Sequence, residues 1–112
     1  MKNIVAFIRP SKEEAVRETL HGLASVTGAS FSDVRGFGRG RAHSKDSFNE
    51  AIIGTLSKVR VDVMVSDEEA ESVGNTIARA AHTGNRGDGK VYILHVESAL
   101  RVSTGEAGAG AV

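Results

Sequence analysis

Hydrophobic and polar residues alternate along several parts of the chain, and this alternation predicts strands. Between residues 59 and 65 a valine stands at every second position, which is typical of a strand with one buried face. Residues 2–9, 29–36 and 90–96 also have the composition of strands. Pro10 ends the first of them, because proline cannot donate a hydrogen bond to a neighbouring strand.

Two other segments place apolar residues three or four positions apart, which predicts amphipathic helices. The first begins near Ser11 and the second near Ser66. Each start resembles a capping box, in which a serine is followed three residues later by a glutamate. Thr83 and Gly84 end the second helix. Residues 37–57 are polar and have no clear period, so we expect a long exposed loop, which in so small a domain is usually functional or disordered.

The elements follow the order strand, helix, strand, long loop, strand, helix, strand. This order predicts an α+β, ferredoxin-like (βαββαβ) sandwich that forms one domain over residues 1–112. Each helix has a single apolar stripe, so both helices should cover the same face of the sheet. The other face would stay bare in a monomer, and we therefore expect a homo-oligomer. Residues 104–112 are of low complexity, and we expect a flexible tail there.

Composition narrows the classes of function. The 14 basic and 14 acidic residues cancel, whereas a nucleic-acid-binding domain usually carries a basic excess. The chain has no cysteine, which excludes disulfides and thiolate metal sites. No stretch approaches the roughly 20 apolar residues of a membrane-spanning helix, and no targeting segment is visible, so we expect a cytoplasmic protein without membrane insertion.

The segment from Thr83 to Lys90 (TGNRGDGK) is the first candidate for chemistry. Its three glycines let backbone amides approach an anion, and Lys90 adds a positive charge. Gly84, four residues and then Gly89-Lys90 nearly match a phosphate-binding P-loop. However, Val91 replaces the required Ser or Thr, and the segment follows a helix where a P-loop follows a strand. We therefore reject a P-loop enzyme but keep an anion cradle, with a plain helix cap and turn as the alternative.

A second glycine-rich segment, residues 36–41 (GFGRGR), combines alternate glycines with two guanidinium groups that suit a phosphate or carboxylate. Its alternative is a flexible loop base with solvated arginines. Arg101 is a third candidate, which matters only if the fold brings it beside the other two segments. The four histidines lack metal-ligand spacing, so we expect no metal site.

Taken together, these segments resemble the PII signal-transduction family over essentially the whole chain. The matching stretches are MKNIVAFIRPSKEEAVRETL for the first strand and helix, VRGFGRGRAH for the base of the mobile T-loop, LSKVRVDVMVSDEE for the third strand and second helix, TGNRGDGKVYI for the B-loop and ALRVSTGEAG for the C-terminal loop.

The resemblance implies a homotrimer that binds ATP, ADP or AMP, with or without Mg, in the clefts between subunits. It also implies a small-molecule effector, 2-oxoglutarate or bicarbonate, and a target enzyme, transporter or regulator that is contacted through residues 37–57. The implied nucleotide-binding residues are Ser30, Gly36, Phe37, Gly38, Arg39, Met64, Gly87, Asp88, Gly89, Lys90 and Arg101. The implied effector-binding residues are Gly38, Arg39, Gly40, Arg41 and Lys58.

Three positions depart from the family pattern. Gly40 stands where the family usually has a glutamine that helps to hold Mg-ATP with 2-oxoglutarate, although the matching Lys58 is kept. Ser103 replaces a second phosphate-binding arginine, which favours ADP or AMP over ATP. The only tyrosine, Tyr92, is in a strand, so uridylylation of a T-loop tyrosine is not possible. These departures favour a divergent branch, and carboxysome-associated PII-like proteins that respond to bicarbonate are one such group.

Two other classes of function stay open beside the regulator. A small nucleotide hydrolase on the same fold would need a general base, and Asp88 is the one candidate in the glycine-rich segment. A trimeric metal-tolerance protein is disfavoured by the absence of cysteine and of clustered histidines.

Overall fold

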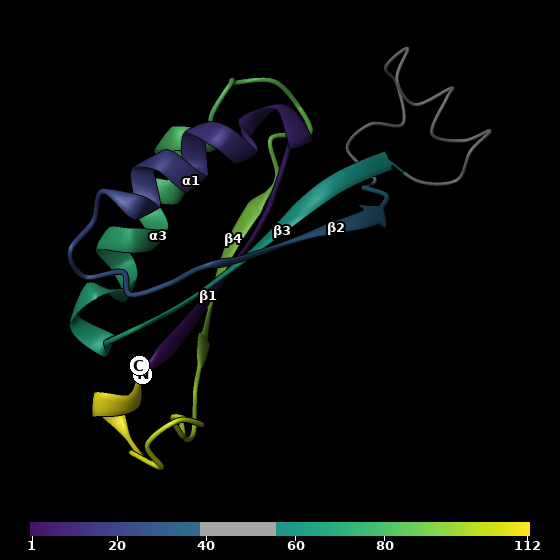
Figure 1. Cartoon of the computed structure of the whole chain (residues 1–112). Coiled ribbons are helices and arrows are strands. Elements are labelled where there is room, and N and C mark those ends of the chain that lie inside the picture. The colour runs from purple at the N-terminus through teal and green to yellow at the C-terminus, as the bar shows by residue number, and fades with distance from the viewer. Residues whose placement is uncertain (39–55) are drawn as a thin grey trace.

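We describe a computed structural model of the chain, which covers residues 1–38 and 56–112. The order of elements agrees with the sequence prediction (Figure 1). The strands are β1 (Lys2–Ile8), β2 (Ser30–Gly36), β3 (Leu56–Val65) and β4 (Lys90–His95); the α-helices are α1 (Glu13–His21) and α3 (Asp67–Ala81); two 3-10 turns are η1 (Pro10–Lys12) and η3 (Ala109–Ala111).

The four strands form one antiparallel sheet in the order β2-β3-β1-β4. This is the predicted ferredoxin-like fold, in which the first and third strands lie in the centre. β3 begins three residues earlier than the valine pattern indicated, because Leu56 and Ser57 continue the pairing opposite Gly36 and Arg35. The bulk of the long polar segment, residues 39–55, lies outside the described residues.

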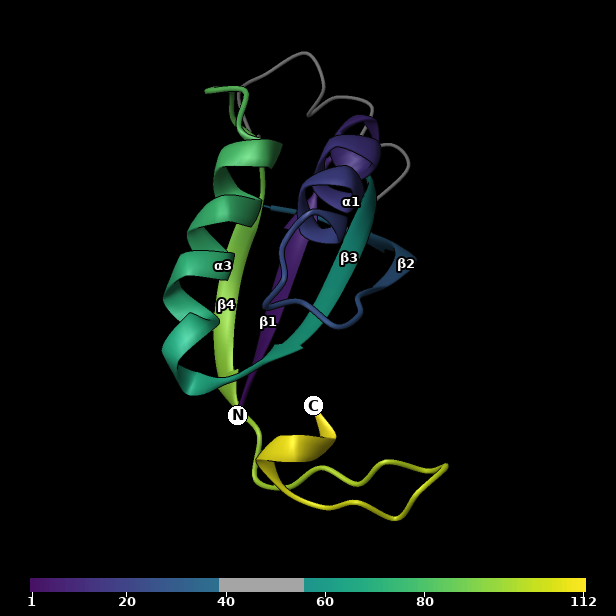
Figure 2. The ribbon, with the colours of Figure 1, turned by 60° about the vertical axis from the view of Figure 1, so that its left-hand side comes forward.

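Both helices pack on the same face of the sheet, as their single apolar stripes predicted (Figures 1 and 2). The core forms between that face and the helices, and apolar area buried there is the main source of stability. Its buried members are Ile4, Ala6, Ile8, Val16, Leu20, Val59, Val61, Val63, Val65, Ala70, Val73, Ile77 and Ala81. The four valines that defined the clearest strand are all part of this core.

On the opposite face of the sheet, which we call the open face, none of the helices in the described residues packs (Figure 2). Phe7 and Tyr92 meet there edge to face, with ring centroids 6.3 Å apart. The Arg60 guanidinium lies 5.8 Å from the Phe7 ring and forms an ion pair of 2.9 Å with Asp62. This pairing lowers the pKa of Asp62. Exposed aromatic rings beside a paired charge are typical of a surface that contacts another molecule.

The two helix starts differ from the predicted capping boxes. Pro10 fixes a backbone angle that starts η1, so Ser11 lies inside this 3-10 turn and Lys12 is the residue that precedes α1. Ser66 does precede α3, but its side chain makes no capping hydrogen bond. The first turn of α3 contains three acidic residues, which favour the positive end of the helix dipole. The capping boxes were therefore wrong, although the second helix starts where we expected.

The C-terminal segment folds back on itself at the end of the sheet where β1 starts (Figures 1 and 2). Leu100 and Ala107 form an isolated antiparallel bridge, and η3 follows. The backbone amide of Arg101 donates to the carbonyl of Glu106 at 2.8 Å. Within the described ranges, none of the helices is both long and apolar enough to cross a membrane.

Candidate functional site

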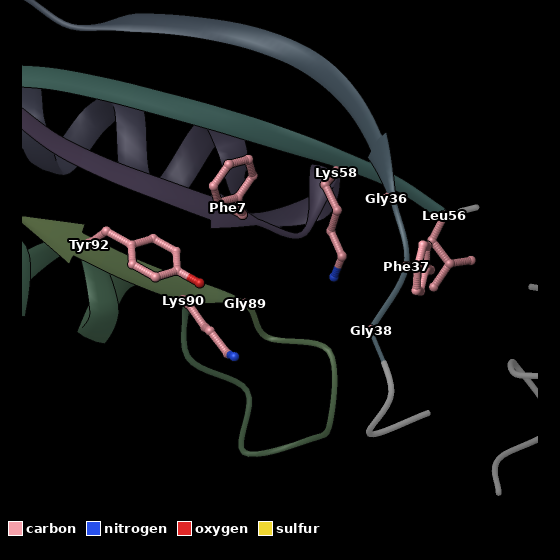
Figure 3. A pocket seen from close by; sticks show the side chains of 9 residues that line it. All are labelled: Phe7, Gly36, Phe37, Gly38, Leu56, Lys58, Gly89, Lys90 and Tyr92. Atoms are coloured by element: carbon pink, nitrogen blue, oxygen red, sulfur yellow. The ribbon is translucent and has the colours of Figure 1, made fainter. Parts of the chain in front are cut away.

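A cleft of about 260 Å³ opens at the end of the sheet where β2 ends and β4 begins (Figure 3). It collects residues from segments that are far apart in the sequence. Its lining consists of Phe7, Gly36, Phe37, Gly38, Leu56, Lys58, Gly89, Lys90 and Tyr92. Five of the residues that we named from the sequence as nucleotide contacts, together with Lys58, therefore line a single cleft.

Two ammonium groups stand at this cleft, and glycine backbone surrounds them. Lys58 and Lys90 come from β3 and β4 (Figure 3). The Lys58 ammonium donates a hydrogen bond of 2.5 Å to the carbonyl of Gly87. A Cβ at Gly36 or Gly38 would meet nothing within 4 Å, so the backbone of residues 36–38 leaves open space beside these charges. Such a cleft suits an anion with several oxygens.

The glycine-rich turn, residues 83–89, is organised by a carboxylate of its own. Asp88 accepts hydrogen bonds from the backbone amides of Thr83 at 2.8 Å and Gly84 at 2.9 Å, and from the Thr83 hydroxyl. The amide of Asn85 donates in turn to the Thr83 hydroxyl oxygen at 3.1 Å. The first three amides of the turn are therefore already used, and a bound anion can be met only by later residues, of which Gly89 and Lys90 line the cleft.

These contacts determine the ionisation of Asp88. The hydrogen bond from the Thr83 hydroxyl, then those from the Thr83 and Gly84 amides and from Arg9, hold the pKa of Asp88 far below its usual range. A general base works best with a pKa near the working pH. Asp88 is thus a poor base, and its main task is to close the turn.

Gly89 is the point where the turn rests on β1. Its φ is +104°, and a Cβ built there would stand 1.6 Å from the carbonyl oxygen of Phe7. Only glycine fits such a close approach of two backbones at a positive φ. Gly84 and Gly87 also have positive φ values, of 90° and 95°. The glycines of this segment are thus required by the geometry of the turn.

Three of the predicted nucleotide contacts do not line the cleft. In the strand register, Ser30 pairs with Asp62 at the start of β2, level with the middle of β1, and Met64 pairs with Asn3 near the start of β1. Arg101 follows β4 and contacts its own segment, since its guanidinium lies 3.8 Å from the Glu106 carboxylate and 3.3 Å from the Gly110 carbonyl. Within one chain, these residues do not meet the cleft.

The remaining predicted residues are divided between the turn and the part outside the description. Gly87 and Asp88 belong to the glycine-rich turn, beside the cleft. Arg39, Gly40 and Arg41, predicted as effector contacts, lie outside the described residues. Within the described ranges, no three His, Asp or Glu side chains group as a metal site would require.

Sequence reasoning missed the aromatic walls of the cleft and one cation behind the turn. The missed aromatic residues are Phe7 of β1 and Tyr92 of β4, whose rings meet on the open face, whereas Phe37, which had been named from the sequence, is 74% exposed at the rim. The alternation of β1 held the signal for Phe7, because the core takes Ile4, Ala6 and Ile8. Arg9 carried no such signal, since it lies 79 residues from its partner.

Comparisons with known proteins point to a single family. The family model described as Nitrogen regulatory protein P-II matches residues 1–106. The Nitrogen regulatory protein P-II of Rhizobium meliloti (strain 1021) is 39% identical over 113 aligned positions, which cover all of both chains. Its namesake from Azospirillum brasilense is 37% identical over the same full length. The Nitrogen regulatory protein GlnK of Escherichia coli (strain K12) is 35% identical, with 96% of each chain covered.

Proposed function

Because this chain belongs to the nitrogen regulatory protein P-II family, we propose that it is a regulator that binds an adenine nucleotide and signals its presence to a partner protein through residues 37–57. The observation that carries the proposal is the cleft, in which Lys58 and Lys90 stand among the glycine backbones of residues 36–38 and 89. Two ammonium groups beside unobstructed backbone suit a polyphosphate. The neighbouring Phe7 and Tyr92 offer apolar surface.

We further propose that the complete site lies between two subunits of a homotrimer. Ser30, Met64 and Arg101 do not line the cleft of their own chain, and a neighbouring copy can bring them to it. The open face supports this arrangement. It exposes Met64, Tyr92 and Leu94 by 42–48%.

The buried Oδ1 of Asn3 adds to this support, because it has no hydrogen-bond partner in the described part of the chain. Buried polar atoms are normally paired, so a neighbouring copy that supplies a donor would complete it.

The finer identity of the ligands follows from the chain's departures from the family pattern. Ser103 offers no charge to a third phosphate, which supports ADP or AMP over ATP, with Mg bound through the nucleotide when present. Lys58 can pair with a carboxylate of 2-oxoglutarate. Gly40 has no side chain to help, which supports bicarbonate as the alternative effector.

A regulator fits this site better than a nucleotide hydrolase. Hydrolysis needs a base or a water-positioning group, and the Asp88 carboxylate is held by Thr83, Gly84 and Arg9 with a lowered pKa. The same proposal places the protein in the cytoplasm, with the nucleotides that it would sense.

Calorimetric titration of ADP and ATP tests the proposal, first alone and then with Mg and 2-oxoglutarate or with bicarbonate. We expect about one nucleotide per chain. Lys90→Met should weaken ADP binding about tenfold to hundredfold, as expected for the loss of one charge-assisted contact. Lys12→Met, which removes an equal charge in η1 outside the cleft, should bind as the wild type does. Absence of nucleotide binding in the wild type would refute the proposed function.

A mixing experiment tests whether the site spans two subunits. Lys90→Met and Arg101→Met each remove one of the two positive charges that the proposed shared site needs, so each pure variant should bind ADP poorly. When the two variants are unfolded and refolded together, some clefts combine an intact Lys90 from one chain with an intact Arg101 from its neighbour. Recovery of tight binding in the mixture supports a shared site. No recovery, or a monomeric mass in light scattering, would contradict it.

A further inference from the structure

Arg9 stands behind the cleft and lines no part of it. It lies between β1 and η1, directly before Pro10, and a residue before proline is restricted to extended backbone. The observed angles, φ −65° and ψ 141°, agree with this restriction. Pro10 therefore restricts the backbone of Arg9, and this restriction limits the directions in which the Arg9 side chain can point.

The Arg9 side chain reaches the glycine-rich turn at two points. Its Nε donates to Oδ1 of Asp88 at 3.0 Å, and its Nη2 donates to the carbonyl oxygen of Arg86 at 2.6 Å. The side chains of Arg9 and Asp88 are only 23% and 22% exposed. A planar guanidinium can make both contacts at once, because its donors point in fixed directions. A lysine at this position would bring a single ammonium group to the two acceptors.

We propose that Arg9 is a positioning residue for the nucleotide site, which fixes the glycine-rich turn on β1 so that Gly87, Gly89 and Lys90 face the cleft. The inference rests on the proposed function. Gly87 lies between the two residues that Arg9 holds, and its carbonyl accepts the hydrogen bond from Lys58. A displacement of the turn would therefore move the Lys58 and Lys90 ends of the cleft relative to each other.

The hydrogen bonds within the turn do not involve Arg9. Asp88 accepts from the amides of Thr83 and Gly84, and we expect these bonds to persist when the guanidinium is removed. The turn would then remain folded but lose its attachment to the segment after β1. This distinction separates a positioning role from a general structural one, because ligand affinity should fall while the thermal stability of the chain changes little.

The test compares Arg9→Gln and Arg9→Lys with Arg17→Gln. The last variant removes an equal charge from α1, where Arg17 only pairs loosely with Glu13 at 3.8 Å. Two quantities are measured on the full chain: the Kd of ADP by calorimetry, and amide hydrogen exchange over residues 83–90 without ligand. We expect Arg9→Gln to raise the Kd about tenfold and to speed exchange in the turn. Arg9→Lys should fall in between, and Arg17→Gln should match the wild type.

The outcomes separate the inference from the proposed function. If the wild type binds no ADP, the proposed function fails, and the role of Arg9 in that site fails with it. If the wild type binds and Arg9→Gln binds equally well, only the inference is overturned. Faster exchange throughout the chain with a large fall in Tm would also overturn it, because Arg9 would then support the whole fold.

Discussion

The contact between Gly89 and Phe7 allows a quantitative prediction for Gly89→Ala. A Cβ would stand 1.6 Å from the Phe7 carbonyl oxygen, whereas real Cβ atoms stay at least 3.0 Å away, so one backbone must retreat by about 1.4 Å. Neither can do so freely, since Phe7 pairs with Lys90 in the ladder between β1 and β4.

Two costs add in this variant. A residue with a side chain at φ +104° is strained by about 1–3 kcal/mol. Forcing an extra methyl group against packed backbone costs about another 1–3 kcal/mol. We therefore expect a loss of about 2–6 kcal/mol, a large part of the roughly 5–15 kcal/mol of an ordinary domain. The midpoint of thermal unfolding should fall by at least about 8 °C.

Urea unfolding followed by circular dichroism measures this loss. All variants are compared at one chain concentration, because association would shift the apparent stability. Gly28→Ala is the matched control: a Cβ there meets nothing within 4 Å, and Gly28 has no positive φ. The control should differ from the wild type by at most about 1 kcal/mol. If Gly89→Ala is as stable as Gly28→Ala, the reasoning about the close approach is refuted.

Three further predictions concern the core, a helix and pH. Ile77→Ala empties a fully buried position and should lower the free energy of unfolding in urea by about 2–5 kcal/mol, and an unchanged value would contradict the core described here. Gly74→Ala should instead stabilise α3 by about 0.5–1 kcal/mol, because its Cβ would meet Ile93 at an ordinary 3.6 Å; a lower Tm would show that this space is not available. The lowered pKa of Asp88 means that the native state releases this proton more readily than the unfolded chain, so the carboxylate's contribution is complete above about pH 4 and is lost as the pH falls through the native pKa. Asp88→Asn should therefore flatten the fall of Tm between about pH 5 and pH 2, and an unchanged slope would exclude Asp88 as its source.

The sequence predicted the fold because its strongest patterns coincide with burial. Along residues 59–65 the valines lie in the core and the residues between them lie on the open face, as the alternation predicted. Each helix turns an apolar side toward this core. The first capping box failed because Pro10 imposed a 3-10 turn before α1, and at the second box Ser66 precedes α3 without a capping hydrogen bond from its side chain. Local sequence could not weigh these alternatives.

The sequence pattern indicated the glycines and Lys90 of the candidate site, whereas Lys58 followed from the family resemblance and the residues that support the site were not indicated. The glycines and the lysine of TGNRGDGK combine exposed backbone amides with a positive charge, and this combination indicated an anion from the sequence alone. Arg9 contacts Asp88, 79 residues later in the chain, and no local pattern reveals this contact. The alternation of β1 assigns Phe7 to the open face but does not reveal its contact with Tyr92. Ser30, Met64 and Arg101 could not be assigned to the cleft from one chain, because the fold leaves all three outside its lining.

The carboxylate within the glycine-rich turn has a consequence for the entropy of ligand binding. Ordering one residue of backbone costs roughly 1–2 kcal/mol, and a loop that folds only around its ligand subtracts this cost from its affinity. Here Thr83, Gly84 and Arg9 already converge on Asp88, so the turn loses its freedom when the chain folds. If the proposed function holds, an arriving anion would meet preorganised backbone, and its affinity would reflect the contacts themselves.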